Sequence, residues 1–453
     1  MSPHNTQSIP PGNSFNRMGL MSSKLKSFLG FMTTKMANNG KYAAVDQGVI
    51  SISNFLASIL LARLVSPTQL GIYVLGFLAI YLMRSIQDGL IIQPMNAFGA
   101  VATPEDFKGY FTTAAIHQVI LASLSAVAAL LTGWILTQLG NDTVGPAVFT
   151  LWFSFFMWQL QEFLRRTFYA RSQVKKAIAL STVSNLIRIG IIVLLGRISE
   201  INGHTGLNAI GWGALAATLI GVWQARTYFT SKIPNLRAAW LHNWRFGRWI
   251  LGASIADWVV MHLYPIIMAG MVSFAAAGAY QALQNLVAPI HVLLRATDTF
   301  ATPQAAKAYH QSGFTRLKKY LGLIYLVSGI PILTLLFLDL LYAPQLLYLL
   351  KGDTYLPFAD GIFVMALFYF FLFINWPLQI AFRAIRKGKQ IFFANLLAII
   401  SMGSVGIWLI HRWGLYGAIG GQALNALIVS LVLLIGWSKI SRRAESSQSK
   451  EMD

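Results

Sequence analysis

The sequence contains no cysteine and few charged residues. None of its 453 residues is cysteine, and only 11% are Asp, Glu, Lys or Arg. The lack of cysteine excludes disulfides, zinc–thiolate sites and iron–sulfur clusters. Soluble globular chains carry about a quarter charged residues. A chain with so little charge and 56% hydrophobic residues is therefore not expected to be a soluble domain.

Motifs for the common catalytic mechanisms are also missing from the sequence. It has no P-loop, no HExxH, no G-x-S-x-G and no DxD-type glycosyltransferase cluster. No stretch between the hydrophobic blocks is long enough to form an ATPase domain. We therefore expect no enzyme activity, no catalytic residue, no bound metal and no cofactor. The energy for any transport would come from a gradient, the membrane potential or substrate turnover.

Hydrophobic residues occur in blocks of about twenty, which is the length of helix that crosses the roughly 30 Å hydrocarbon core of a bilayer. Backbone groups in lipid must be paired within the segment, so the blocks are expected to be helices. The sequence predicts an all-α integral membrane protein of about twelve spans. The predicted spans are Tyr42–Val65, Leu70–Ile92, Phe111–Gln138, Val144–Phe168, Ile178–Arg197, Asn208–Phe229, Arg248–Val272, Ala277–Phe300, Tyr320–Leu341, Pro357–Phe382, Ile391–Ile410 and Leu415–Trp437.

Basic residues predict the orientation of the spans. The formal net charge is +20, and most of the 35 lysines and arginines lie in alternate loops and in the two tails. The opposite loops hold only Arg63, Arg197, Lys351 and Arg412. This asymmetry places both termini in the cytoplasm and predicts an even number of spans. Because the charge lies between hydrophobic blocks, we expect membrane lipid as a partner and no nucleic acid.

A weak internal repeat predicts two halves. Five residues near the first turn match five near the seventh without a gap: Ala62, Val65, Ser66, Gly71 and Tyr73 match Ala269, Val272, Ser273, Gly278 and Tyr280. Parallel repeats of six spans are a known plan of transporters. We therefore expect two pseudo-symmetric six-helix bundles, residues 41–230 and 248–438, around a central cavity. A leader (1–40) with a possible interfacial segment, a cytoplasmic linker (231–247) and a cytoplasmic tail (439–453) complete the predicted organisation.

Several predicted spans carry polar residues on one face, as expected for helices around an aqueous cavity. The candidates for substrate binding are Gln47, Asn54, Arg84, Arg188, Gln281, Gln284, His291 and Arg295. The candidates for coupling or charge pairing are Asp88, Glu162, Asp257, His262 and Asp298. Alternative interpretations remain open: Arg84–Asp88 and Arg295–Asp298 could be structural ion pairs, and the Ser and Asn residues of the first span could simply join helices.

Arg188 is predicted near the middle of its span, with no acidic residue in that span. A charge at this depth costs at least about 2.5 kcal/mol, so a partner is expected. Glu162 or Asp257 on another helix could be that partner, or an anionic substrate could be; we favour the substrate. Asp46 stands at the membrane entrance, where a helix-start role and a coupling role are equally compatible with the sequence.

Four segments carry a resemblance to a known family. They are LLARLVSPTQLGIY (60–73), GLIIQPM (89–95), AGAYQALQNL (277–286) and FRAIRKGKQ (382–390). Together they resemble the polysaccharide-flippase branch of the multidrug/oligosaccharidyl-lipid/polysaccharide exporter superfamily. The resemblance implies two six-helix bundles, a V-shaped cavity lined by positive charge, and alternating access. It also implies that the substrate is an undecaprenyl-pyrophosphate-linked oligosaccharide of O-antigen (lipopolysaccharide) or exopolysaccharide.

The same resemblance implies a bacterial inner membrane, and glycosyltransferases and a polymerase of the same pathway as possible partners. A headgroup of charge near −2 that moves outward would gain about 4–5 kcal/mol per 100 mV of inside-negative potential. Three rival functions remain. A cation-coupled multidrug exporter would use acids such as Asp46, Glu162 and Asp257. A lipid II flippase would be expected to have fourteen spans, whereas this chain has room for about twelve. A polysaccharide polymerase or ligase would need large outer loops, and the outer loops of this chain are short.

Overall fold

The computed structural model describes residues 42, 45–99, 102–231, 235–385 and 387–449, and nearly all of them are helical, with no strand among them. The predicted leader lies outside the described residues. By length and composition, 8 of the described helices, or 9 if one bent pair counts as a single span, are apolar enough to cross a membrane. The stretch Gly388–Arg442 counts once in that number although it contains a non-helical residue, Gly414, with φ of 54°.

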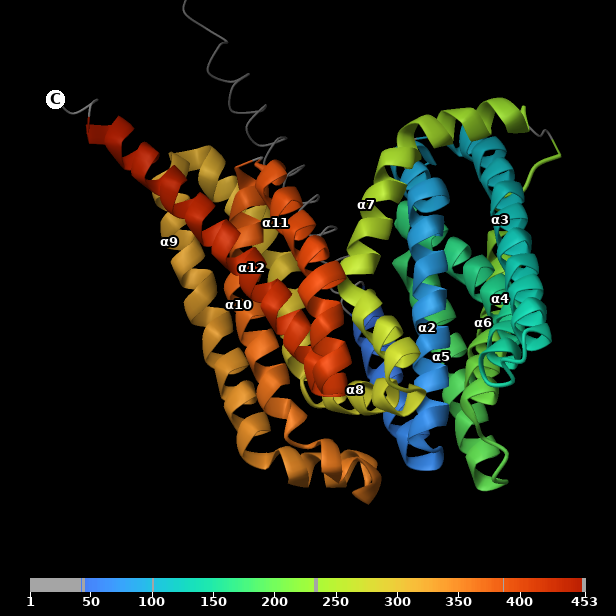
Figure 1. Ribbon diagram of the computed structural model, residues 1–453. Helices are drawn as coiled ribbons and strands as arrows, with labels where there is room; N and C mark the ends of the chain where they lie inside the picture. Colours follow the sequence, from blue (N-terminus) through green and yellow to red (C-terminus); the bar gives the residue numbers. More distant parts are fainter. Residues whose placement is uncertain (1–41, 43–44, 100–101, 232–234, 386, 450–453) are drawn as a thin grey trace, which may run out of the picture.

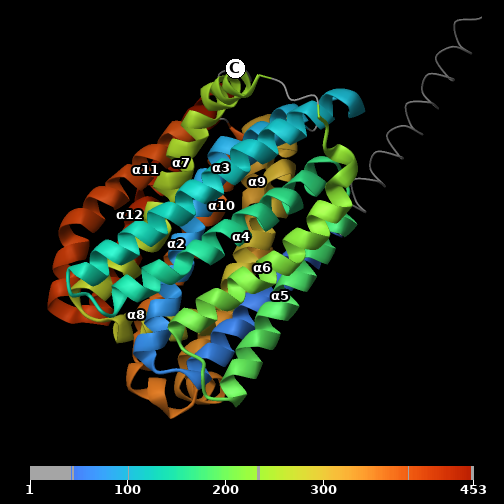
Figure 2. The same cartoon turned by 90° about the vertical axis from the view of Figure 1, so that its right-hand side faces the viewer.

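The first half of the chain forms one bundle, which we call the N-bundle (Figures 1 and 2). Its elements are a first helix (Val45–Leu64), α2 (Pro67–Gln87) with the π-helical turns Asp88–Ile92 and Met95–Gly99, α3 (Pro104–Gln138), α4 (Val144–Ala170), α5 (Val174–Arg197), α6 (Gly203–Ala225) and a 3-10 turn (Arg226–Tyr228). Each predicted span of this half coincides with one of these helices. Five of these six helices are long and apolar enough to cross a bilayer by length and composition, and α4 is the exception.

The second half forms the C-bundle, joined to the first by α7 (Leu236–Met271). Its elements are α8 (Phe274–Leu286), α9 (Ala288–Lys351), a 3-10 turn (Asp353–Phe358), α10 (Gly361–Ala384), α11 (Gly388–Ser401), the π-helical turn Met402–Gly406 and α12 (Ile407–Ser449). Gly313, with φ of 64°, interrupts α9 in a conformation that glycine adopts without strain. The element contains the predicted span Tyr320–Leu341 and the second part of the predicted span Ala277–Phe300.

Two expectations differ from the structure. The predicted span Ala277–Phe300 is broken, because α8 ends at Leu286 and α9 starts at Ala288. Pro289, in the first turn of α9, has no N–H to donate and its ring disfavours a helical turn before it, which agrees with a break at Val287. In addition, α7 is already helical from Leu236, within the stretch 231–247 that was predicted to be a linker.

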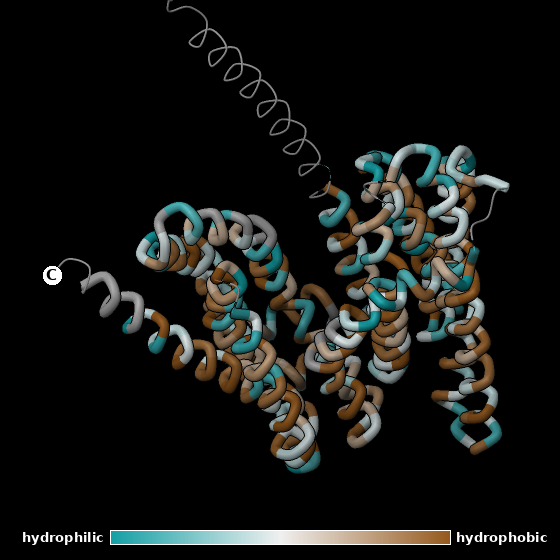
Figure 3. The backbone as a smooth tube through the Cα atoms, turned by 90° about the horizontal axis from the view of Figure 1, so that it is seen from above, coloured by the Kyte–Doolittle hydropathy of each residue, from teal (hydrophilic) through white to brown (hydrophobic). Residues whose placement is uncertain are grey.

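The two bundles form a V (Figure 1). They separate toward the end that holds the α4–α5 turn and the C-terminal part of α12. We call this end the basic end, because most lysines and arginines lie there. Seen from above, the bundles lie side by side as separate groups of helices (Figure 3). They approach each other at the opposite end, where α2 meets α8. The all-α, two-bundle fold expected from the sequence is therefore confirmed, and the number of helices is consistent with about twelve spans.

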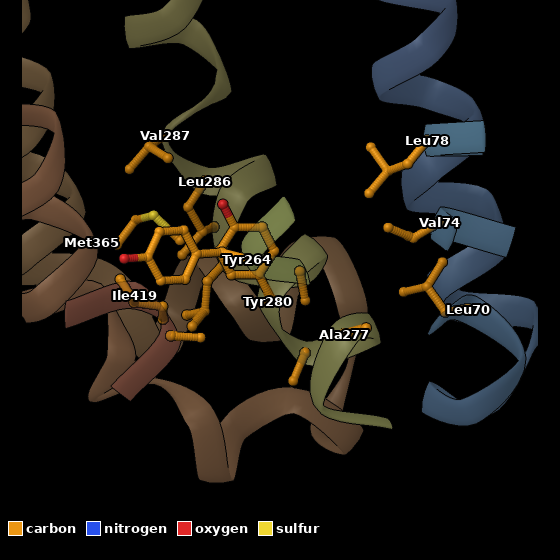
Figure 4. Close-up of a cluster of buried hydrophobic side chains, with 14 of the residues drawn as sticks. Leu70, Val74, Leu78, Tyr264, Ala277, Tyr280, Leu286, Val287, Met365 and Ile419 are labelled. Atoms are coloured by element: carbon orange, nitrogen blue, oxygen red, sulfur yellow. The ribbon is translucent and has the colours of Figure 1, made fainter. Parts of the chain in front are cut away.

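A hydrophobic cluster joins the bundles near the opposite end. Figure 4 shows Leu70, Val74 and Leu78 of α2 opposite Ala277 and Tyr280 of α8. Both helices begin with a serine cap: the Ser66 hydroxyl accepts from the Gln69 amide, and the Ser273 hydroxyl accepts from the Ala276 amide. Ser66 and Ser273 are matched residues of the internal repeat, so the repeat corresponds to equivalent positions in the two bundles.

Helix α7 contacts both bundles. Its first part, Leu236–Ala256, and its last part, Met261–Met271, are bent by 51° relative to each other. Gly247 in the first part lies against the backbone of Gly89 in the N-bundle. Tyr264 in the last part is buried against Gly406 and Gly421 of the C-bundle. The position of one bundle is thus linked to the other through a single bent helix.

Candidate functional site

A group of polar and basic side chains lies where α2, α7 and α9 face one another. On α2, the Arg84 guanidinium lies 5.7 Å from the centre of the Tyr81 ring, one turn earlier in the helix. The Tyr81 ring in turn lies 6.0 Å from the ring of His262 in α7. These contacts bring α2 of the N-bundle to α7.

The α9 side contributes a second arginine and a second histidine. The Nε of Arg295 donates to Nε2 of His291 at 3.0 Å, one helical turn away. Arg295 is also close enough to His262 to interact with it electrostatically. We call Tyr81, Arg84, His262, His291 and Arg295 the central basic cluster. It contains four of the residues that the sequence placed in the cavity or at a coupling site, and Tyr81, the polar residue one turn before Arg84.

Aromatic and amide side chains surround this cluster. The His291 ring meets the rings of Tyr369 and Trp376 of α10 edge-on, with centroids 6.3 and 5.8 Å apart. Gln284 of α8 lies near Tyr369. Flat aromatic faces and amides are the groups that bind sugar rings and hydroxyls, so the C-bundle side of the cluster offers both kinds of contact.

Asn285 links the bundles next to these amides and was not a candidate from the sequence. Its Nδ2 donates to the Ser58 hydroxyl of the first helix at 2.7 Å, and its Oδ1 accepts from Gln281 at 3.0 Å. The only sequence signal was its place one residue after Gln284. A pairing with Ser58, 227 residues earlier, can be seen only in three dimensions.

The acidic candidates of α2 and α9 have partners other than the two cluster arginines. Asp88 accepts a hydrogen bond from Gln93 at 3.0 Å. Asp298 pairs with Arg383 of α10 and accepts from Thr302 at 3.2 Å. The ion pairs Arg84–Asp88 and Arg295–Asp298, left open by the sequence, do not occur among the described residues. In this conformation Asp88 and Asp298 therefore bind other side chains.

Arg188 of α5 lies inside the N-bundle and not in the central basic cluster. Its side chain is 5% exposed, and one guanidinium nitrogen donates to Oδ1 of Asn54 at 2.9 Å. Its Nε and Nη2 have no hydrogen-bond partner among the described residues. No described carboxylate forms an ion pair with it. In this conformation Arg188 is buried, and its role in substrate binding stays a prediction.

Glu162 is not the partner of Arg188. It is buried in a charged network with Arg165 at 2.7 Å and Arg166 at 2.8 Å. Arg165 also reaches Asp46 of the first helix at 2.6 Å, and the Tyr169 hydroxyl donates to the same carboxylate at 2.6 Å. The two acids and two arginines balance in charge. This network joins the first helix to α4, and both carboxylate oxygens of Glu162 accept hydrogen bonds from arginines.

Two candidates remain, Gln47 and Asp257. Gln47 is exposed and donates to Ser51 at 3.2 Å, within its own helix. The side chain of Asp257 lies outside the described residues. Among the described residues, no group of three or more His, Cys, Asp or Glu could hold a metal ion.

A buried amide cluster in the N-bundle was also missed from the sequence. Nε2 of Gln87 donates to Oε1 of Gln118 at 2.9 Å and to the Gln159 carbonyl at 2.7 Å. All three residues are fully buried, so these bonds hold α2, α3 and α4 together inside the N-bundle. The signal in the sequence was a glutamine within each of three hydrophobic spans.

Comparisons with known proteins agree with this arrangement. A family described as polysaccharide biosynthesis protein matches residues 60–360. A search of curated proteins gives no match. One similar structure is the inward-facing conformation of a multidrug resistance MATE family transporter of the MOP superfamily. Its TM-score is 0.69 at 14% identity, over 88% of this chain and 96% of that one.

Two further structures share the fold with lower scores. An outward-facing conformation of a multidrug resistance MATE family transporter has a TM-score of 0.57 at 14% identity, over 88% of this chain and 94% of that one. A MOP superfamily transporter from Pyrococcus furiosus has a TM-score of 0.57 at 15% identity, over 88% of this chain and 93% of that one. It is described as having a binding pocket of reverse polarity that suggests a different function.

Proposed function

We propose that this chain, a member of the polysaccharide biosynthesis protein family, flips an undecaprenyl-pyrophosphate-linked oligosaccharide across the bacterial inner membrane. Its fold, which it shares with exporters of the MOP superfamily, supports this proposal. The oligosaccharide would be a precursor of O-antigen or exopolysaccharide. It would move from the cytoplasmic to the periplasmic leaflet by alternating access, with both termini of the chain in the cytoplasm. Glycosyltransferases and the polymerase of the same pathway would supply and consume it.

The central basic cluster is the observation that supports this cargo. Arg84 and Arg295 lie on helices of different bundles, and the acids beside them in sequence bind other residues. A pyrophosphate presents several acceptor oxygens, and guanidinium groups bind such groups with two parallel N–H donors. Two arginines from two bundles could therefore hold one diphosphate between them while its lipid tail stays in the bilayer.

The surroundings of the cluster suit the glycan part of the same molecule. Tyr369 and Trp376 offer aromatic rings beside His291, and Gln284 offers an amide near Tyr369. The bundles separate toward the basic end and meet at the opposite end (Figure 1). With the basic end in the cytoplasm, this conformation would take up cargo from the cytoplasmic leaflet.

A cation-coupled multidrug exporter is the main alternative, since one similar structure is that of a multidrug resistance MATE family transporter. Such a protein needs acids that are free to bind a cation or a cationic drug. Here Asp46 and Glu162 form ion pairs with arginines, and the five residues of the central basic cluster include two arginines and no acid. A membrane-embedded polymerase or ligase is a weaker alternative, because the described connections at the opposite end are short turns.

The test is deletion of the gene followed by analysis of polyprenyl-linked sugars. We expect lipid-linked oligosaccharide to accumulate and surface polysaccharide to be lost, and the wild-type gene to reverse both effects. Arg84→Gln and Arg295→Gln should fail to complement although the protein remains in the membrane. Arg197→Gln, at the opposite end and outside the cluster, is the matched control and should complement. Normal surface polysaccharide together with drug sensitivity would instead identify a multidrug exporter.

A further inference from the structure

The first part of α7 is a basic and aromatic helix with no acidic residue. Residues 236–249, which we call the α7 basic segment, contain Arg237, Arg245 and Arg248 together with three tryptophans and a phenylalanine. The central basic cluster lies on the later part of α7 and on other helices. The proposed transport function therefore does not account for the composition of this segment.

One face of the segment is fixed to the N-bundle. The Asn243 side chain accepts a hydrogen bond from the Tyr110 hydroxyl at 3.3 Å and is buried. The rings of His242 and Phe246 lie 4.5 and 5.2 Å from the ring of Phe98. Gly247 lies against the Gly89 backbone, too closely for any side chain. The segment is thus held in place by specific contacts, and its rotation about its own axis is fixed.

The other face is exposed and mixes cations with large apolar groups. Leu241, Trp244 and Trp249 are exposed, and Trp249 is 76% exposed. Arg237, Arg245 and Arg248 are exposed beside them. The Arg248 guanidinium lies 5.4 Å from the centre of the Trp249 ring. No ion pair between these arginines and a described carboxylate is present.

The position of the segment matches the headgroup layer of a bilayer. In Figure 1 it runs across the basic end of the N-bundle, at a large angle to the helices that cross the membrane. Tryptophan and arginine are enriched at this depth, because the ring bridges the apolar and polar layers while the guanidinium meets phosphates. Anionic headgroups attract each basic residue near the surface.

We propose that the α7 basic segment binds the headgroups of anionic phospholipids in the leaflet at the basic end. The bound lipid anchors the N-bundle end of the one helix that continues, through its 51° bend, into contact with the C-bundle. The partner is an anionic lipid surface and not a soluble anion, because the arginines alternate with exposed tryptophans and a leucine that need an apolar layer. The proposal is independent of the identity of the transported glycan.

The natural chain has no cysteine, so a single introduced cysteine can be labelled uniquely. We would replace exposed Leu241 (Leu241→Cys), attach an environment-sensitive fluorophore and reconstitute the full-length protein in vesicles. Lipids brominated on the acyl chains quench such a probe on contact. We expect brominated phosphatidylglycerol, diluted into phosphatidylcholine, to quench more strongly than brominated phosphatidylcholine at the same mole fraction.

The combined variant Arg237→Gln, Arg245→Gln and Arg248→Gln tests whether the three arginines cause the preference for phosphatidylglycerol. We expect the preference for phosphatidylglycerol to fall by roughly fivefold for each arginine removed. The matched control removes three exposed lysines of the same end but on the C-bundle, Lys387→Gln, Lys389→Gln and Lys439→Gln. It should keep the preference. Equal quenching by the two lipids, no quenching by either, or an equal loss in the control variant would each overturn the proposal.

Discussion

Gly71 of α2 lies directly against the backbone carbonyl of Phe274 in α8, so closely that a methyl group at Gly71 would overlap that oxygen. The contact is reciprocal, because a methyl group at Gly278 of α8 would overlap the carbonyl of Pro67 in α2. Gly71 and Gly278 are matched residues of the internal repeat. The two bundles therefore close the opposite end through one pair of equivalent glycines, which allow the backbones to touch.

Substituting either glycine should weaken this closure. Overpacking a tight contact costs about 1–3 kcal/mol, so we expect Gly71→Ala or Gly278→Ala to shift the population away from this conformation by at least about fivefold. The opening can be measured by the rate at which a thiol reagent, added from the side of the opposite end, labels the variant Ser58→Cys. Cysteine is nearly isosteric with serine, and the chain has no other cysteine. Gly190→Ala is the control, since a methyl group there meets nothing within 4 Å. Wild-type labelling and transport in both glycine variants would disprove a role for the contact.

Arg63 provides a second link at the same end. Its Nε donates to the carbonyl of Leu350 at 3.0 Å, and another guanidinium nitrogen donates to the carbonyl of Leu349. These carbonyls end α9, so the first helix is tied to the C-bundle. We expect Arg63→Gln to raise labelling of the Ser58→Cys reporter by up to about fivefold, the effect of about 1 kcal/mol. Arg197→Gln should leave it unchanged; an equal rise in that control would point to surface charge instead.

The sequence predicted the helices far better than the contacts between them. Each span of the N-bundle was found because an unbroken apolar stretch of bilayer length has no alternative to a helix. The break at Val287 was missed, since the stretch around it stays apolar and Pro289 is the only local sign of it. The early start of α7 was missed because charged residues after Leu236 suggested a loop, whereas they belong to a helix docked on the N-bundle.

The candidate site was harder to predict, because it depends on contacts between helices. Arg84, His291 and Arg295 were found because charges within spans are rare and stand out. Arg165, in contrast, was not among the candidates, although it is 6% exposed and pairs with Asp46, 119 residues earlier. Periodicity along one helix cannot show which helix faces it. For that reason Glu162 remained an open partner for Arg188 until the structure assigned it to Arg165 and Arg166.

The charged network of α4 should therefore control stability. Removing one member of a buried ion pair leaves an uncompensated charge and costs about 3–5 kcal/mol. We expect Arg165→Gln to lower the melting temperature and the yield of folded protein in detergent. Arg166→Gln is the comparison, because its side chain is 29% exposed and water can replace the lost partner. Equal melting temperatures of the two variants would contradict the assigned role of Arg165.

Arg188 keeps a buried charge with two unsatisfied nitrogens, which costs stability in this conformation and implies a need for it in another. Arg188→Met, of similar volume, should leave the melting temperature unchanged or raise it, since well-packed apolar replacements of buried charges are often neutral or stabilising. We nevertheless expect it to abolish export of the lipid-linked glycan, and Arg188→Lys, which retains the charge, to keep part of it. Surface polysaccharide, thermal unfolding and membrane content of the three proteins provide the measurement. Full export by the Met variant would reduce Arg188 to a packing residue, and failure of both variants to reach the membrane would make its role structural.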